Sequence, residues 1–303
     1  MVRRLFFCPL LCLVVAQAQP PTADQNQPPE ARPFFSRIGG LFDFDLPELD
    51  PPGTVKLILH PHLSDFIRRD YLRAEVGFRW ALNRNFELSA EASTYLTHGL
   101  GGGSAGYGIG ELRLGTKYIF TEWLHPTYEA SVTFNASRPT GTPPLDMTDG
   151  FNHLEPGLTI QRHSERYPRL TTFAEAGLDL LTRSSSPGTL RPNEPHDDSF
   201  SLTAGAVYDL GQFKFTLAGT YASTALLGDE TAHFYYLRPS LLWYVPTSYT
   251  FHSKTQWIVG FGLRSTWGPD GYDFGVSTRV RAEITFRQVL AQIRDRTKSR
   301  EAR

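Results

Sequence analysis

The chain has almost no cysteine. Its only two cysteines, Cys8 and Cys12, lie in the apolar segment at the N-terminus. Once that segment is removed, the chain has no disulfide, no thiol nucleophile and no cysteine-ligated zinc. A domain of this size then has to be held together by other means, and a closed hydrogen-bonded barrel is one of them.

Two further features are missing. The net charge is only -1, with 30 Lys and Arg against 31 Asp and Glu, and it lacks the basic footprint that a nucleic-acid partner requires. After the N-terminal segment no run of 18 apolar residues occurs, so no transmembrane helix is expected. Aromatic residues make up 13% of the chain and there are 26 glycines. This composition fits either a soluble all-β domain or a transmembrane β-barrel.

The N-terminus has the layout of a secretory signal peptide. Residues 1–4 are positively charged, residues 5–15 are apolar, and Ala16-Gln17-Ala18 is a small-x-small cleavage signal. We predict cleavage after Ala18. The alternative, a membrane anchor, is disfavoured because an apolar run of about eleven residues, broken by Pro9, is too short to span a bilayer.

Residues 19–52 are rich in proline and lack strand periodicity. This composition predicts a periplasmic linker. It contains a short apolar insert, residues 34–49, for which docking on the barrel or partial plugging of it remains an alternative.

From Gly53 onward the apolar residues recur with period two. In residues 71–82 the apolar positions are Leu72, Ala74, Val76, Phe78, Trp80 and Leu82, and residues 86–97 repeat the pattern. Such alternation over ten or so residues is typical of a strand with one apolar and one polar face.

The pattern continues along the chain and predicts a closed antiparallel transmembrane β-barrel of twelve strands, residues 53–286. The segments are 54–60, 71–82, 86–98, 109–120, 127–138, 153–163, 170–182, 199–209, 213–224, 233–245, 256–267 and 272–286. The first is the weakest, so ten strands remains an alternative.

Short and long connections alternate. Only residues 83–85 and 210–212 separate two of the strand pairs, whereas 99–108, 139–152, 183–198 and 226–232 are longer. This alternation is typical of a barrel with short periplasmic turns and longer outside loops. An even strand count places both termini in the periplasm.

Aromatic residues gather at the predicted strand ends. Trp80, Trp243 and Trp257 flank periplasmic turns, and Trp267 and Tyr272 lie near the opposite ends. Rings in these places are typical of the interfacial girdles of an outer-membrane barrel. A soluble secreted β-protein, with its aromatics at mid-strand, remains the alternative.

The polar faces of the strands carry charges of both signs, which a soluble barrel would not bury in its core. We predict that they face the lumen. The residues are Arg73, Glu75, Arg79, Glu87, Glu91, Glu111, Arg113, Lys117, Glu129, Glu155, Glu175, Asp179, Arg238, Arg264, Arg279, Arg281 and Glu283, with Asp209 and Lys214 on the same face. Two interpretations stay open: an interior closed by salt bridges, or a polar channel whose balanced charges give weak ion selectivity.

One predicted strand resembles a known family. Residues 106–120, GYGIGELRLGTKYIF, are similar to the G-x-G-D-x-x-x-G-x-K-Y-x-F strand of outer-membrane barrels of the MetA-pathway of phenol degradation family, often described as transporters. Glu111 stands where aspartate is usual. The likeness covers about fifteen residues, and it implies a barrel that passes small molecules, aromatic ones among the candidates, without identifying a binding residue.

The last predicted strand resembles the barrel-assembly signal of outer-membrane proteins. It ends in Phe286, with Ile284 two positions before it. Arg281 stands where glycine is usual, and a tail follows. Residues 287–303 predict a short basic amphipathic helix at the periplasmic rim, with contact to anionic lipid headgroups or a solvated terminus as alternatives.

Other motifs favour loops. Residues 101–106 satisfy G-x-G-x-x-G, but a dinucleotide site needs a helix after the glycines and here a strand is predicted. Groups that could bind a metal lack recognised ligand spacing and are interpreted as solvated loops. They are His60 and His62 with Asp65; His196, Asp197 and Asp198; and Asp146 and Asp149 with His153 and Glu155.

We expect no cofactor, no metal and no catalytic residue. Ser93, Thr94 and His98, or Ser164 beside His163, supply components of a hydrolase site without a motif. The expected function is passive passage of small hydrophilic or aromatic solutes through an outer-membrane barrel. The alternatives are a closed structural or surface-binding barrel, and an outer-membrane hydrolase. The expected partners are outer-membrane lipid, lipopolysaccharide and the barrel-assembly machinery.

Overall fold

The computed structural model describes residues 49–62, 71–97, 107–121, 125–140, 151–183, 198–224, 232–250, 255–269 and 271–286. All of them belong to one compact unit, Leu41–Arg303. The predicted signal peptide, most of the proline-rich linker and the basic tail lie outside the described residues. Among the residues that are described, no helix is long and apolar enough to cross a membrane.

The described chain forms twelve strands and one short 3₁₀ helix. The strands are β1 (Val55–Pro61), β2 (Tyr71–Ala81), β3 (Phe86–Thr97), β4 (Tyr107–Phe120), β5 (Tyr128–Pro139), β6 (Phe151–His163), β7 (Leu170–Arg183), β8 (Ser199–Asp209), β9 (Phe213–Thr224), β10 (His233–Val245), β11 (Thr255–Gly268) and β12 (Gly271–Phe286), and the helix η2 is Thr247–Tyr249. Each strand lies within two residues of its predicted bounds, because period-two alternation is a local property of the sequence.

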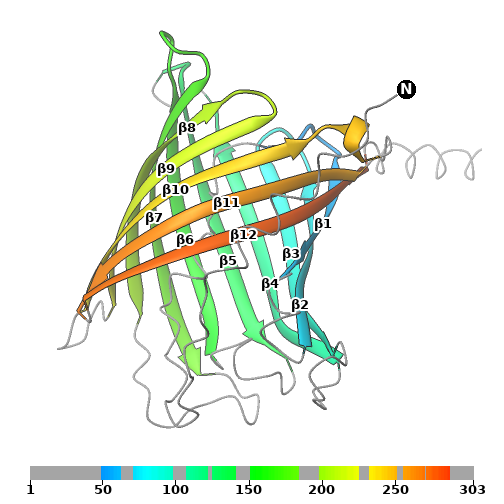
Figure 1. Cartoon of the computed structure of the whole chain (residues 1–303), viewed down its shortest axis with the longest axis vertical. Coiled ribbons are helices and arrows are strands. Elements are labelled where there is room, and N and C mark those ends of the chain that lie inside the picture. Colours follow the sequence, from blue (N-terminus) through cyan, green and yellow to red (C-terminus); the bar gives the residue numbers. More distant parts are fainter. Residues whose placement is uncertain are drawn as a thin grey trace, which may run out of the picture. The chain divides into compact units, whose positions relative to one another are not determined.

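The strands form one closed antiparallel barrel, as predicted (Figure 1). Each strand pairs with its neighbours in the chain, and β12 pairs back with β1, where Val55 lies opposite Phe286 and Leu59 opposite Ala282. The ten-strand alternative is therefore wrong. Closure leaves no strand edge with unpaired backbone groups, which is the condition for a sheet to exist in hydrocarbon.

The connections at one end are short and stabilised by side chains. In the turn between β2 and β3, the Asn83 side-chain oxygen accepts hydrogen bonds from the backbone N–H groups of Asn85 and Phe86. In the turn between β8 and β9, Gly211 has a φ of +83°, which favours glycine, and its N–H donates to Asp209. Most connections at the opposite end are longer, but β11 and β12 are joined there by residues 269 and 270 alone.

The two faces of the sheet have the reverse of the polarity found in a soluble protein. Large apolar side chains are exposed, as in Leu114 (56%) and Val276 (56%), whereas Ser131, Thr159 and Gln161 are at most 1% exposed. In a soluble barrel the apolar face fills the interior. Here the apolar face points outward, as in barrels that meet lipid.

A β-bulge in β4 changes the pairing with β3. Ser93 pairs with Glu111 and Thr94 with Ile109, so Gly110 is the extra residue. The bulge lets Ile109 and Leu112 both lie on the exposed face, at 49% and 42% exposure, and keeps Glu111 on the buried one. Strict alternation across the bulge would have placed Ile109 and Glu111 on one face.

Candidate functional site

We call the face of the sheet opposite the exposed apolar side chains the polar face. All seventeen charged residues predicted for the lumen lie in strands, at positions that alternate with the outward apolar residues. Several are deeply buried, among them Asp179 (0%), Arg238 (7%) and Glu87 (7%). Buried charge has to be compensated by partners, and the polar face supplies them in pairs and small networks.

The first network is centred on Arg113 of β4. Its Nη2 donates to Glu155 of β6 at 2.8 Å, across the intervening strand β5. Its guanidinium also interacts electrostatically with Glu75, Glu91 and Glu111. One cation thus interacts with four carboxylates.

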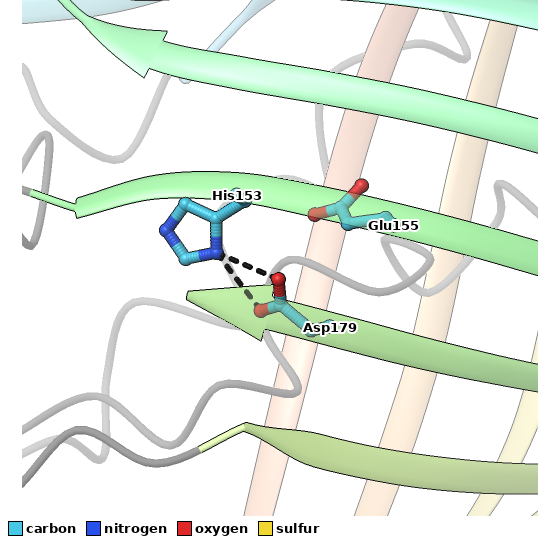
Figure 2. A group of neighbouring side chains, drawn as sticks. All are labelled: His153, Glu155 and Asp179. Atoms are coloured by element: carbon cyan, nitrogen blue, oxygen red, sulfur yellow. Dashed lines mark hydrogen bonds and ion pairs between the residues drawn. The ribbon is translucent and has the colours of Figure 1, made fainter. Parts of the chain in front are cut away.

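The second network is a buried histidine and aspartate. His153 of β6 and Asp179 of β7 have side chains exposed by only 1% and 0%, and Nδ1 of the imidazole lies 2.9 Å from both carboxylate oxygens (Figure 2). The carboxylate therefore fixes the imidazole orientation with Nδ1 as the donor. Sequence reasoning placed Asp179 on the polar face but missed this pair, because the two residues are 26 positions apart.

Glu155 completes a group that has the composition of a metal site. One ligand atom from each of His153, Glu155 and Asp179 lies within 4.8 Å of the others. An imidazole and two carboxylates are donors that suit Zn²⁺ and other first-row metals. Two of these donors are already engaged, however: Glu155 accepts from Arg113 and Asp179 accepts from His153. The residues present therefore form a hydrogen-bonded cluster with Arg113.

The interpretation of His153 and Glu155 as parts of a solvated loop is wrong. Both belong to strand β6 and both are buried, at 3% and 9% exposure. Asp146 and Asp149, the other members of that predicted group, lie outside the described residues. The ligand that the fold brings to this place is Asp179, from the next strand.

The histidines near the end of β1 also have a partner that the sequence did not indicate. His60 Nδ1 lies 3.0 Å from Glu75, and His62 Nε2 lies 3.5 Å from the other oxygen of the same carboxylate. Asp65, which the sequence grouped with these histidines, lies outside the described residues. Strand β2 supplies Glu75 because it pairs directly with β1, where His60 lies opposite Glu75.

Ion pairs also tie the closing strands together. Lys56 of β1 lies 3.6 Å from Glu283 of β12, and Arg281 lies 2.9 Å from the same carboxylate. Asp50, which precedes β1, lies 2.8 Å from Lys56. The contact of Lys56 with Glu283 crosses the seam between the first and the last strand, and the other two contacts hold its two members in place.

Those predicted hydrolase components that the structure describes have other partners. Ser93 and Thr94 are adjacent in β3 and so point to opposite faces, and the Thr94 hydroxyl donates to the Ala74 carbonyl. Ser164 accepts a turn hydrogen bond from the Tyr167 N–H. His98, the glycine-rich stretch 101–106 and the group at 196–197 lie outside the described residues.

The barrel is similar to solved outer-membrane channels. It superposes on the outer membrane channel from Pseudomonas putida F1 with a TM-score of 0.51 and 11% identity, covering 80% of this chain and 99% of that one. The NanC porin (TM-score 0.44, 10% identity, 78% and 99% covered) and the KdgM porin (0.43, 10%, 77% and 98%) also match. The first likeness shows that the fold is that of an outer-membrane channel barrel.

The sequence comparisons find no relatives. No family model matches the chain, and no curated protein matches it. The resemblance of residues 106–120 to the MetA-pathway of phenol degradation family therefore stays a prediction.

Proposed function

We propose that this protein is an outer-membrane channel for the passive passage of small solutes, with the polar face of the barrel lining a water-filled lumen. The observation that carries the proposal is the reversed polarity of the sheet. Apolar side chains such as Phe274 (51%) and Leu217 (53%) are exposed, and charged side chains are buried on the other face. This arrangement is stable when lipid surrounds the barrel.

Export supports the same proposal. The N-terminal segment 1–18 has the layout of a signal peptide. The first strand begins and the last strand ends at the short-turn end of the barrel, which we place in the periplasm. In this proposal residues 19–52 form the periplasmic linker and residues 287–303 the basic tail. The lipid and lipopolysaccharide of the outer membrane contact the apolar face.

A finer proposal concerns the solutes. Residues 106–120 resemble a strand of a family linked to phenol degradation, which favours small aromatic molecules among the solutes. The polar face offers aromatic surface as well: Tyr71 and Tyr95 form an edge-to-face pair with centroids 6.1 Å apart, on the first two strands of the β2–β3–β4 meander. A planar aromatic solute would interact with these rings by the same ring-to-ring geometry.

The rival proposal is a barrel closed by its own ion pairs. Arg113 with Glu155, His153 with Asp179, and Lys56 with Glu283 all lie on the polar face, and each side chain held by a partner narrows the lumen. A closed barrel would act structurally or through its outside loops.

Single-channel recording separates the two proposals. The chain from residue 19 onward, refolded in detergent and added to a planar bilayer, is expected to give steady open steps. Absence of conductance steps from both this chain and the chain from residue 53 onward, each showing β-sheet circular dichroism and heat-modifiable gel mobility, would contradict the channel. The chain from residue 53 onward is the matched variant, because steps that appear only after this deletion would assign a plug to residues 19–52.

A further inference from the structure

The charges of the polar face balance in number but not in position. Among the strand side chains that the structure describes, β3 to β8 carry eight carboxylates and two cations on this face. The carboxylates are Glu87, Glu91, Glu111, Glu129, Glu155, Glu175, Asp179 and Asp209, and the cations are Arg113 and Lys117. We call these six strands the acidic half.

The other six strands have the opposite excess. On their polar faces β9 to β12, β1 and β2 carry eight cations and three carboxylates. The cations are Lys214, Arg238, Arg264, Arg279, Arg281, Lys56, Arg73 and Arg79, and the carboxylates are Asp273, Glu283 and Glu75. We call these strands the basic half.

Barrel closure makes each half a continuous wall. The strand order runs without a break from β3 to β8, and from β9 through β12 to β1 and β2, because β12 pairs with β1. In a closed ring of twelve strands, β5 lies opposite β11 and β6 lies opposite β12. Five strands separate the two members of each pair in either direction around the ring. The acidic and basic halves therefore face each other across the lumen.

Several of the ion pairs that the structure describes join groups of the same half and so leave the difference between the halves in place. Arg113 with Glu155 lies in the acidic half, and Glu283 with Lys56 and Arg281 lies in the basic half. Lys214 with Asp209 crosses one border, between β8 and β9, near the turn that joins them. Two electrostatic interactions also link the halves, that of Arg238 with Glu175 and that of Arg113 with Glu75. Within the basic half, Arg238 and Arg264 on neighbouring strands interact as like charges.

Two facing walls of opposite sign produce an electric field across the lumen. Low-dielectric walls concentrate such a field in the space between them, and the field acts on any dipole that enters. A monovalent ion is attracted electrostatically by one wall and repelled by the other. A nearly neutral lumen therefore discriminates weakly between K⁺ and Cl⁻. A solute with separated positive and negative groups is stabilised at both walls at once.

We propose that the channel selects small zwitterionic solutes, oriented with the ammonium group toward the acidic half, β3 to β8, and the carboxylate toward the basic half, β9 to β2. The inference rests on the proposed function, in that the polar face has to line an open lumen. It adds the class of solute and the orientation in which that solute passes.

The test compares two isomers of equal mass, alanine and lactamide, in a liposome-swelling assay with the refolded chain from residue 19 onward. Alanine is a zwitterion at neutral pH and lactamide is uncharged. After subtraction of the rates in protein-free liposomes, alanine is expected to enter at least about twofold faster than lactamide. Equal rates, or faster entry of lactamide, through a channel that conducts ions would overturn the inference while leaving the channel function intact. Absence of ion conductance, in this chain and in the chain from residue 53 onward, would instead contradict the channel function itself.

Charge variants test the origin of the preference. The triple variant Arg238→Gln/Arg264→Gln/Arg279→Gln removes three of the eight cations of the basic half, and Glu87→Gln/Glu129→Gln/Glu175→Gln removes three of the eight carboxylates of the acidic half. Both are expected to lower the alanine-to-lactamide ratio. In a KCl gradient the first should turn the channel cation-selective and the second anion-selective.

The matched control is Arg138→Gln/Arg162→Gln, which removes two positive charges from the exposed face of β5 and β6. It should leave the solute ratio and the reversal potential unchanged. Heat-modifiable gel mobility verifies that each variant is folded. A ratio that persists in both triple variants would overturn the proposal, because the preference would then not arise from the two walls.

Discussion

The guanidinium of Arg113 on β4 reaches across β5 to donate a 2.8 Å hydrogen bond to Glu155 on β6. This contact joins strands that share no backbone hydrogen bond. It also places the principal cation of the acidic half among four carboxylates: Glu155, Glu91, Glu111 and Glu75. Side-chain contacts of this kind link strands that are not neighbours in the sheet, which backbone hydrogen bonds cannot do.

This shared cation predicts an asymmetry between two substitutions. Arg113→Gln leaves four carboxylates without their common cation, and we expect a loss of about 3 kcal/mol in the free energy of unfolding. Glu155→Gln leaves Arg113 with three other carboxylates, so its loss should be clearly smaller. Urea unfolding of the barrel in lipid vesicles measures both. Equal losses of unfolding free energy would show that Glu155 is the only carboxylate that Arg113 stabilises.

The buried pair of His153 and Asp179 predicts a strong effect of one conservative change. Asp179→Asn removes the charge that orients the imidazole, in a place where both side chains are almost fully buried, and should destabilise the barrel by about 2 kcal/mol. The matched control is Asp209→Asn. The Asp209 side chain is 45% exposed, and its pairing with Lys214 should contribute less than about 1 kcal/mol. Comparable unfolding curves for the two variants would contradict the structural role of the buried pair.

A glycine that faces an aromatic ring predicts a steric effect. Phe173 on β7 lies directly opposite Gly205 on β8, and a Cβ on this glycine would lie 2.7 Å from the ring and 2.6 Å from the Leu217 carbonyl oxygen. Gly205→Ala should therefore destabilise the barrel by about 1–3 kcal/mol. Gly219→Ala on β9 is the control, since the nearest atom to its Cβ would be 3.9 Å away. If the two variants have the same free energy of unfolding, the close approach of the Phe173 ring to Gly205 has no steric effect on stability.

Adjacent residues of one strand should differ in access to water. Asn135 lies on the polar face of β5 and Phe134 on the exposed face, at 46% exposure. Both native cysteines precede residue 13, so a chain that begins at residue 19 carries only the introduced thiol. In vesicles a charged thiol reagent should modify Asn135→Cys at least about tenfold faster than Phe134→Cys, since the thiolate forms in water.

The same pair of cysteine variants has an internal control. An apolar maleimide that partitions into lipid should reach Phe134→Cys readily, which verifies that the thiol is present and reduced. Faster reaction of Phe134→Cys with the charged reagent would reverse the assignment of the two faces and contradict a lipid-exposed apolar surface.

The sequence by itself determined the architecture of this protein. Alternation between Leu72 and Leu82, and again along the last strand to Phe286, depends only on residues two apart, so strand bounds and the polarity of each face follow from local pattern. The even strand count and the alternation of short and long connections then favoured a closed barrel. The group of charged residues on the polar face could be chosen in the same way.

The tertiary structure decided which of these charges meet. The bulge at Gly110, the pairing of His153 with Asp179 and the reach of Arg113 to Glu155 depend on the register between strands. That register is set by closure of the whole barrel and not by any one segment. The separation into an acidic and a basic half has the same origin, because only the pairing of β12 with β1 makes the arginines of both chain ends one continuous wall.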